Sequence, residues 1–156
     1  MASTQGLRFL QAAGVAVTLH PYDYDPHADA VGLAAARALG LDPALTLKTL
    51  MVEVDGRPVC CVIPSDRQLS MKKVAAAFGG KTAAMMAVPL AEKLTGYRVG
   101  GISPFGQKRV VPTAIEVTVC AADRVWINAG QRGVLLGIGP AQALAVLGAM
   151  ARPLVA

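Results

Sequence analysis

The sequence predicts an α+β fold built on a mixed β-sheet, and three observations lead to this prediction. Apolar stretches with helical spacing and apolar stretches with strand spacing are interspersed along the chain. At least two of the strand pairs are joined by short turns, so these pairs are antiparallel, and a doubly wound parallel sheet is disfavoured. The 156 residues are 54% hydrophobic and contain no Pro/Ser-rich linker, so we expect a single domain over residues 1–156.

The first 45 residues predict a helix, a strand, a turn and a second helix. Ser3 or Thr4 caps the first helix, which stops at Gly14. The next elements are then expected as a strand at Val15–His20, a polar turn at Tyr22–Pro26, an Ala-rich helix ending at Gly40 and a helical turn at Asp42-Pro43.

The remaining elements follow from turn and cap residues. Asp55-Gly56 is the strongest hairpin signal in the chain, and it joins strands at Leu47–Val54 and Pro58–Ile63. Helices are expected at Met71–Phe78, at Pro89–Leu94 and after Pro140. Further strands are expected at Tyr97–Val99, Ile115–Val119, Val125–Asn128 and Val134–Ile138, the last two joined by the turn Ala129–Gly133.

Composition narrows the class of partner and the compartment. A formal net charge of +5 favours a polyanionic partner. No apolar stretch is long and uninterrupted enough to be a credible membrane span, and no signal peptide is recognisable, so a cytoplasmic protein is expected. Cys60 and Cys61 alternate faces if they lie on a strand, which suits buried apolar filling better than a disulfide or a shared metal. His20 and His27 are too few to complete a metal site, so no metal and no cofactor are expected.

The segment Val99–Arg109 carries the densest functional signal. Gly100 and Gly101 allow close approach of the backbone to a ligand, Pro104 restricts its neighbours, and the N–H groups of Gly101 to Ser103 are able to converge on one oxygen. Gln107, Lys108 and Arg109 add polar and cationic groups. The alternative is an ordinary Gly/Pro surface turn with a solvated basic end.

Lys48 is the second signal, because it lies in a strand whose other members are mostly apolar. It is either an edge-strand charge that points to water and prevents aggregation, or a cleft residue that meets a phosphate, hydroxyl or carboxylate of a ligand. No serine elbow, Cys–His pairing, phosphate-binding Walker loop or dinucleotide glycine motif is present, so a protein nucleophile and nucleotide chemistry are not indicated.

Four segments together resemble the YbaK/EbsC family over roughly residues 4–148. These segments are Leu47–Leu50 with Lys48, Ile63–Leu69, Thr95–Arg109 and Ala129–Gly133. The resemblance implies a barrel-like mixed sheet surrounded by helices, related to the editing domain of bacterial prolyl-tRNA synthetases. It also implies trans-editing: deacylation of mischarged tRNA, chiefly Cys-tRNA(Pro) and also Cys-tRNA(Cys), with prolyl-tRNA synthetase as a transient partner and neither DNA nor membrane as one. In the YbaK branch, the thiol of the substrate attacks its own ester carbonyl and forms a thiolactone.

The resemblance also implies roles for individual residues. Lys48 is expected to hold the terminal adenosine or its phosphate, and the amides of Gly100, Gly101 and Ser103 to receive the carbonyl oxygen. The other expected site residues are Tyr22, Ile102 and Pro104 for the substrate, and Gln107, Lys108, Arg109 and Arg132 for tRNA.

The sequence departs from the family pattern after Gly133, where Leu135 lies in a stretch that usually carries a polar or acidic residue and a Glu. Strict cysteine specificity is therefore an open point. Two alternatives remain: a water-dependent deacylase for alanine or another small amino acid, and a non-catalytic module that binds tRNA or a synthetase.

Overall fold

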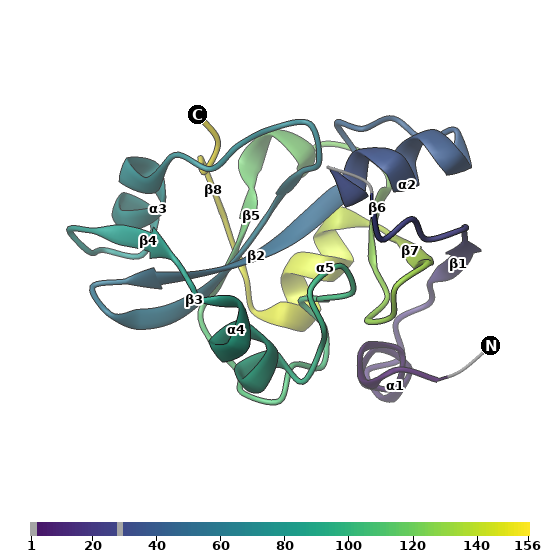
Figure 1. Ribbon diagram of the computed structural model, residues 1–156, viewed down its shortest axis with the longest axis horizontal. Coiled ribbons are helices and arrows are strands. Elements are labelled where there is room, and N and C mark those ends of the chain that lie inside the picture. The colour runs from purple at the N-terminus through teal and green to yellow at the C-terminus, as the bar shows by residue number, and fades with distance from the viewer. Residues whose placement is uncertain (1–2, 28–29) are drawn as a thin grey trace.

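The computed structural model describes residues 3–27 and 30–156 and contains helices on both sides of strongly twisted sheets (Figure 1). The helices are α1 (Gln5–Ala12), α2 (Val31–Leu39), α3 (Met71–Ala77), α4 (Val88–Thr95) and α5 (Pro140–Leu147). The strands are β1 (Thr18–Pro21), β2 (Leu47–Val54), β3 (Arg57–Pro64), β4 (Ala83–Met85), β5 (Thr113–Glu116), β6 (Val125–Asn128), β7 (Val134–Ile138) and β8 (Met150–Arg152).

The helices begin and end where their cap residues require. Thr4 caps α1, since its hydroxyl accepts a hydrogen bond from the amide of Leu7. Ser70 caps α3 in the same way through Lys73. α2 and α4 end at Gly40 and Gly96, whose φ angles of 65° and 79° lie in the left-handed region that favours glycine.

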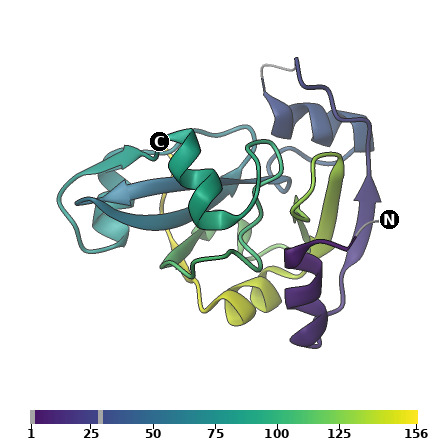
Figure 2. The ribbon, with the colours of Figure 1, turned by 60° about the horizontal axis from the view of Figure 1, so that its bottom comes forward.

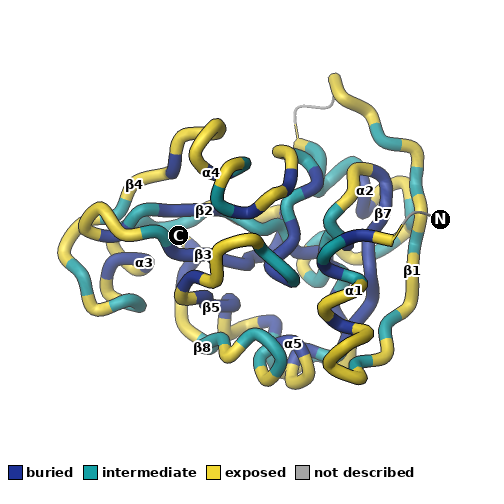
Figure 3. Tube along the Cα trace, turned by 90° about the horizontal axis from the view of Figure 1, so that it is seen from below, coloured by how far each residue is buried: buried dark blue, intermediate teal, exposed yellow. Residues whose placement is uncertain are grey.

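One sheet has five strands in the order β4-β2-β3-β5-β8. β2 and β3 form the antiparallel hairpin that Asp55-Gly56 predicts, with Lys48 opposite Ile63. β5 pairs in parallel with both β3 and β8, so the sheet is mixed. Figure 3 shows β3 and β5 buried along most of their length, whereas β4 at the edge is largely exposed.

The second sheet has three antiparallel strands in the order β1-β7-β6 (Figure 2). It meets the first sheet where Thr46 forms a parallel bridge with Trp126 and the amide of Trp126 donates to the carbonyl of Leu45 at 3.0 Å. We call this junction the seam. The seam joins β6 to the chain just before β2, and among the described strands β1, β4 and β8 remain edge strands, so no closed barrel forms.

Two apolar cores lie on opposite faces of β2 and β3. One contains Met51 and Cys60 together with the inner residues of β6 and β7. The other contains Val52 and Cys61 together with Val74 of α3. This alternation follows from the two-residue period of a strand, and it shows that Cys60 and Cys61 fill opposite cores as expected.

The predicted fold class is confirmed, and several predicted elements differ in their bounds. The strand expected at Tyr97–Val99 is wrong, because these residues lead into a turn. The strand expected at Ile115–Val119 ends at Glu116 and continues as a 3-10 turn over Val117–Val119. β4 and β8, of three residues each, were not expected. Within the described residues, no helix combines the length and the apolar character needed to cross a membrane.

Candidate functional site

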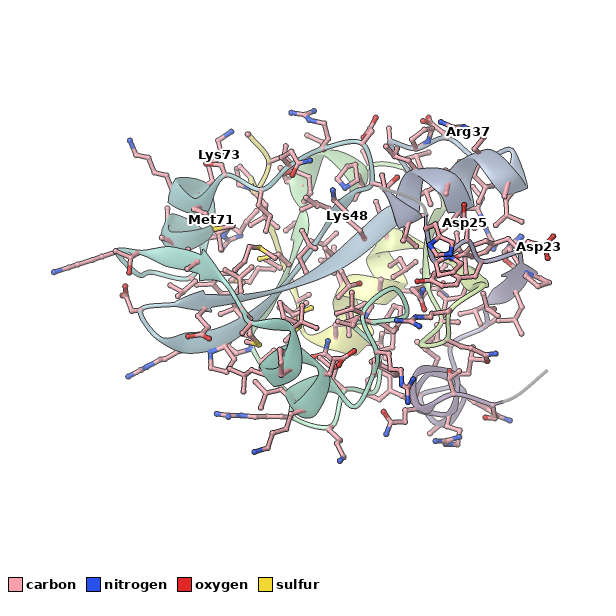
Figure 4. The ribbon with its side chains drawn as sticks, in the orientation of Figure 1. Asp23, Asp25, Arg37, Lys48, Met71 and Lys73 are labelled. Carbon is pink, nitrogen blue, oxygen red and sulfur yellow. The ribbon has the colours of Figure 1, made fainter. Side chains whose placement is uncertain are left out.

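Lys48 lies on β2, half-buried, on the face of the sheet that carries α2 and α3. Its side chain lies between the two helices in the view of Figure 4, where Lys73 marks α3 and Arg37 marks α2. Burial lowers the pKa of Lys48 from its ordinary value, and the nearby charge of Asp66 acts in the opposite direction. Lys48 is therefore a partly desolvated ammonium group near the seam.

A row of side chains continues from Lys48 across the seam. Thr46 and Trp126 are paired, and Lys48 and Asn128 each follow two residues later along their strands, so Lys48 and Asn128 leave the same face. Asn128 pairs with Leu135, and Leu135 pairs with His20. Leu135 is only 4% exposed, so a buried apolar side chain lies between the polar residues Asn128 and His20.

The two glycines after α4 form a tight turn at residues 98–101, which we call the glycine turn. The amide of Gly101 donates to the carbonyl of Arg98 at 2.8 Å, and Gly100 has a φ of 90°. Since Val99 has no positive φ, this is a type II turn, with glycine at the third position that this turn requires. A Cβ at Gly100 would lie 2.7 Å from the hydroxyl of Tyr24, so a side chain there would have to displace Tyr24 as well as adopt a strained φ.

A second turn, at residues 128–133 between β6 and β7, supports the glycine turn. Asn128 donates from Nδ2 to the carbonyl of Gly100 at 3.2 Å, and Arg132 donates from Nε and Nη2 to the carbonyl of Val99 at 3.0 and 2.7 Å. A Cβ at Gly101 would lie 3.0 Å from the backbone nitrogen of Arg132. We call residues 128–133 the support turn.

The segment after β1 completes this cluster. The amide of Tyr22 donates to the carbonyl of Gly133 at 2.8 Å, and the guanidinium of Arg132 lies 5.3 Å from the centre of the Tyr24 ring. Burial raises the pKa of Tyr22. The structure therefore brings together Tyr22, Gly100, Gly101 and Arg132. Among the described residues no hydrogen bond links Lys48 to the glycine turn. Asn128 contacts the glycine turn, and it lies on β6, the strand whose Trp126 forms the bridge with Thr46 two residues before Lys48.

Four of the expected site residues have other tasks in this conformation. The amide of Gly101 is already bonded to Arg98, so it is not a free donor for a carbonyl oxygen. Ser103 is fully buried, and its hydroxyl accepts from the amide of Phe105. Ile102 packs against the core that contains Met51. The amide group of Gln107 donates to the carbonyl of Ser103 at 3.0 Å, so in this conformation its Nε2 is already engaged within the chain, and the expected contact with tRNA stays a prediction.

The remaining expected residues divide by exposure. Pro104 is buried directly after Ser103. Lys108 and Arg109 are exposed, and their amides donate to the carbonyls of Thr95 and Leu94, which fixes them beside the end of α4. Arg132 is exposed as well, but its guanidinium is engaged by the glycine turn.

The thiols of the chain are poor candidates for a nucleophile. Cys60 and Cys61 are completely buried, and burial raises the pKa of each to about 12. Burial also raises the pKa of Cys120. Across residues 3–27 and 30–156, no three His, Cys, Asp or Glu side chains gather as a metal site would require.

Asn128 and Tyr24 are the site residues that sequence reasoning missed. Asn128 accepts from the amides of Gly130 and Gln131 at 2.7 and 3.1 Å, which is the local turn that an Asn two residues before a glycine favours. That signal was available in the sequence, but the partner of its Nδ2 lies 28 residues away. Tyr24 gave no local signal.

Two cavities lie elsewhere on the molecule. One of about 610 Å³ is lined mainly by apolar side chains at the end of the β2–β3 hairpin and of α3, with Arg57 and Arg109 beside them. The other, of about 390 Å³, lies between α1 and β1. Neither is lined by Lys48 or by the glycine turn, so size alone does not locate the candidate site.

Comparison with known proteins now identifies the family. A model of the aminoacyl-tRNA editing domain matches residues 25–145. A curated relative from Enterococcus faecalis (strain ATCC 700802 / V583), the "Putative Cys-tRNA(Pro)/Cys-tRNA(Cys) deacylase EbsC", is 35% identical over 109 residues. The match covers 69% of this chain and 66% of the relative, just under two thirds of the relative's own length.

Solved structures share the fold. A protein described as a putative trans-editing enzyme for prolyl tRNA synthetase superposes with a TM-score of 0.85 at 21% identity, over 100% of this chain and 99% of that chain. The hypothetical protein APE2540 gives 0.86 at 21% identity, over 98% and 100%. At this identity the two structures establish the fold alone. Together with the family model and the EbsC relative, the observations show that this chain belongs to the aminoacyl-tRNA editing domain family, in its YbaK/EbsC group.

Proposed function

We propose that this chain is a deacylase that releases cysteine from mischarged tRNA, with Cys-tRNA(Pro) and Cys-tRNA(Cys) as its substrates. The observation that carries the proposal is the partly desolvated Lys48, two residues after the Thr46–Trp126 bridge at the seam, in a chain that belongs to an editing family. The name of the EbsC relative supports the choice of cysteine. The proposal treats residues 1–156 as one editing unit that works in the cytoplasm.

The substrate supplies the nucleophile in this proposal. A free thiol has a pKa near 8.5, so a few per cent of it is thiolate at neutral pH, whereas Cys60 and Cys61 are buried with a pKa of about 12. The sulfur of the charged cysteine attacks its own ester carbonyl and the C–S bond forms. The bond between the carbonyl carbon and the ribose oxygen of tRNA then breaks, and that oxygen takes up a proton. The products are a thiolactone and free tRNA.

Two groups of the chain assist this step. Lys48, as an ammonium group, holds the terminal nucleotide and supplies positive charge and a proton near the leaving oxygen. A backbone N–H of the glycine turn donates to the carbonyl oxygen as negative charge develops on it. Because the amide of Gly101 donates to Arg98 and that of Val99 donates to Glu92, we assign this role to the N–H of Gly100.

The acceptor stem reaches the site along a basic surface. Lys108 and Arg109 are exposed beside the end of α4, and Lys93 and Arg98 are exposed on α4 and at the start of the glycine turn. These four cations suit a phosphate backbone. Prolyl-tRNA synthetase is the proposed transient partner, since it supplies the mischarged tRNA.

A second candidate, favoured by Leu135, is removal of alanine or another small apolar amino acid by water. Leu135 is buried at the centre of the row between His20 and Asn128, where an apolar side chain offers nothing to an ammonium or hydroxyl group. A deacylase of this kind would not depend on a thiol.

The deciding experiment compares Cys-, Ser- and Ala-charged tRNA(Pro), with the protein alone and with prolyl-tRNA synthetase added. We expect cleavage of the Cys ester and survival of the Ser ester, although a pocket separates such similar side chains by only about 1–3 kcal/mol. Mass analysis of quenched reactions is expected to find the thiolactone. Equal cleavage of Ser- and Cys-tRNA with free amino acid as the only product contradicts the thiol mechanism. Cleavage of the Ala ester alone supports the second candidate. If no ester is cleaved, the result supports the non-catalytic module that binds tRNA or a synthetase.

A further inference from the structure

All three carbonyls that begin the glycine turn are held by hydrogen bonds. The carbonyl of Arg98 accepts from Gly101, that of Val99 accepts twice from Arg132, and that of Gly100 accepts from Asn128. Exposed loops usually leave such groups to water. The support turn therefore fixes the direction of successive peptide planes in the glycine turn.

The direction of the Val99–Gly100 peptide decides where one N–H points. In a trans peptide the C=O and the N–H point in opposite directions. Since the carbonyl of Val99 faces the guanidinium of Arg132, the N–H of Gly100 faces away from it. Rotating this central peptide by half a turn would convert the type II turn toward type I, aim the N–H of Gly100 at Arg132, and break both Arg132 bonds.

The support turn that carries these donors is itself fixed. Oδ1 of Asn128 accepts from the amides of Gly130 and Gln131, so the same side chain shapes the support turn and reaches the glycine turn. The guanidinium of Arg132 also lies over the ring of Tyr24, 5.3 Å from its centre. The two turns lie close together, since a Cβ at Gly101 would lie 3.0 Å from the backbone nitrogen of Arg132.

We propose that Arg132 and Asn128 are positioning residues that hold the Val99–Gly100 peptide so that the N–H of Gly100 is presented to the carbonyl oxygen of the ester. This proposal rests on the deacylase function above. It gives Arg132 a task different from the tRNA contact that the sequence suggests. Asn128 acts through the Gly100 carbonyl and Arg132 through the Val99 carbonyl.

Three variants separate the contacts. Arg132→Gln removes the paired donors, and Arg132→Lys keeps the charge with one compact donor group. Asn128→Asp keeps the oxygen that shapes the support turn but replaces the donor to Gly100 with an acceptor. Arg152→Gln is the charge-matched control, because the Arg152 side chain is exposed on β8, far along the chain from both turns, and its guanidinium donates to the neighbouring Ala151 carbonyl.

The first readout is steady-state deacylation of Cys-tRNA(Pro). Loss of an oxyanion donor costs about 10²–10³ in rate, so we expect kcat to fall about 10–100-fold in Arg132→Gln and Asn128→Asp, with KM near the wild-type value. Arg132→Lys is expected to recover part of the loss, and Arg152→Gln to match the wild type. If Arg132 instead contacts a phosphate, kcat stays unchanged while KM rises and the slope of log affinity against log salt weakens by about 0.7. That outcome overturns the proposal.

The second readout needs no substrate. Amide hydrogen exchange by NMR is measured at Gly101, whose N–H closes the glycine turn. We expect exchange at least about 10-fold faster in Arg132→Gln and Asn128→Asp than in the wild type, with amides of β3 unaffected, which also shows that the variants are folded. Unchanged exchange at Gly101 overturns the proposal whatever the kinetics show. A wild-type protein inactive on every charged tRNA overturns the deacylase function, while the exchange data still decide whether these two residues fix the turn.

Discussion

Lys48 is a half-buried ammonium group on β2. Burial lowers the pKa of Lys48, which means that its charged form is less favourable in free energy in the folded protein than in water. β4 pairs with β2 only at residues 52–54, so at Lys48 the side of β2 away from β3 has no β4 partner. The half-buried position of Lys48 favours the cleft interpretation over a fully solvated edge charge.

Replacing this residue is expected to separate activity from stability. In Lys48→Ala we expect kcat/KM for Cys-tRNA(Pro) to fall by about 10² or more, with a melting temperature at or above that of the wild type. Since the folded-state pKa of this lysine is depressed, its unfavourable contribution is present at neutral pH and fades as the pH rises through that pKa. The control is Lys81→Ala, which removes one lysine beside the turn of the β2–β3 hairpin, away from Lys48. Full turnover in Lys48→Ala removes Lys48 from the mechanism.

At the scale of elements, the C-terminal tail is fastened to β5 by one carboxylate. Glu116 is 1% exposed, and its two oxygens accept from the amides of Leu154 and Val155 and from that of Thr118. Burial opposes ionisation of this group, but the hydrogen bonds outweigh it and lower its pKa. The tail then closes the core that contains Leu154 and Val74.

This contact predicts an acid-sensitive contribution to stability. A carboxylate with a lowered pKa stabilises the folded state above its unfolded value, near pH 4.3, and the contribution is lost as the pH falls through the folded value. In Glu116→Gln we expect the free energy of unfolding to drop by about 2–4 kcal/mol at pH 7. Urea titrations are expected to show the two proteins converging below about pH 4. An equal difference at pH 7 and pH 3.5 contradicts the role of the charge.

Elements specified by local signals could be predicted from sequence, and elements specified by distant partners could not. The hairpin at Asp55-Gly56 and the helices closed by Gly40 and Gly96 depend on nearby residues. β4 and β8 have only three residues each, and β8 pairs with a strand more than 30 residues away. Tyr97 has a high strand propensity, but it lies outside any strand. It is buried, and its hydroxyl donates to the carbonyl of Phe105, a contact that local sequence does not reveal.

The same limit applies to the site. The residue types in the glycine turn could be predicted, because glycines and a proline mark close approach and a fixed turn. The direction of each N–H could not, since it depends on Arg132 and Asn128 in another part of the chain. Gln107 turned inward for a similar reason: its acceptor, the Ser103 carbonyl, lies in a buried bend that composition does not reveal.

For the whole molecule, the net charge of +5 and the exposed cations beside α4 predict salt-dependent binding. Affinity for tRNA(Pro), measured between about 50 and 200 mM salt, is expected to fall with a log–log slope of about −0.7 for each phosphate of a single-stranded end that is neutralised. The double variant Lys108→Ala/Arg109→Ala is expected to reduce this slope by about 1.4, and Lys81→Ala to leave it unchanged. A flat salt response in the wild type argues against tRNA as the ligand.

A ligand bound at the seam would contact residues of both sheets. Lys48 belongs to the five-stranded sheet and Asn128 to the three-stranded sheet, and the Thr46–Trp126 bridge joins the two beside them. In the proposed complex, the terminal nucleotide contacts Lys48 of one sheet and Asn128 of the other. A ligand that binds only the folded state, at 100 times its Kd, adds about 2.7 kcal/mol to the stability of that state. On this proposal, tRNA binding is expected to raise the thermal stability of the protein, and Lys48→Ala to reduce that increase.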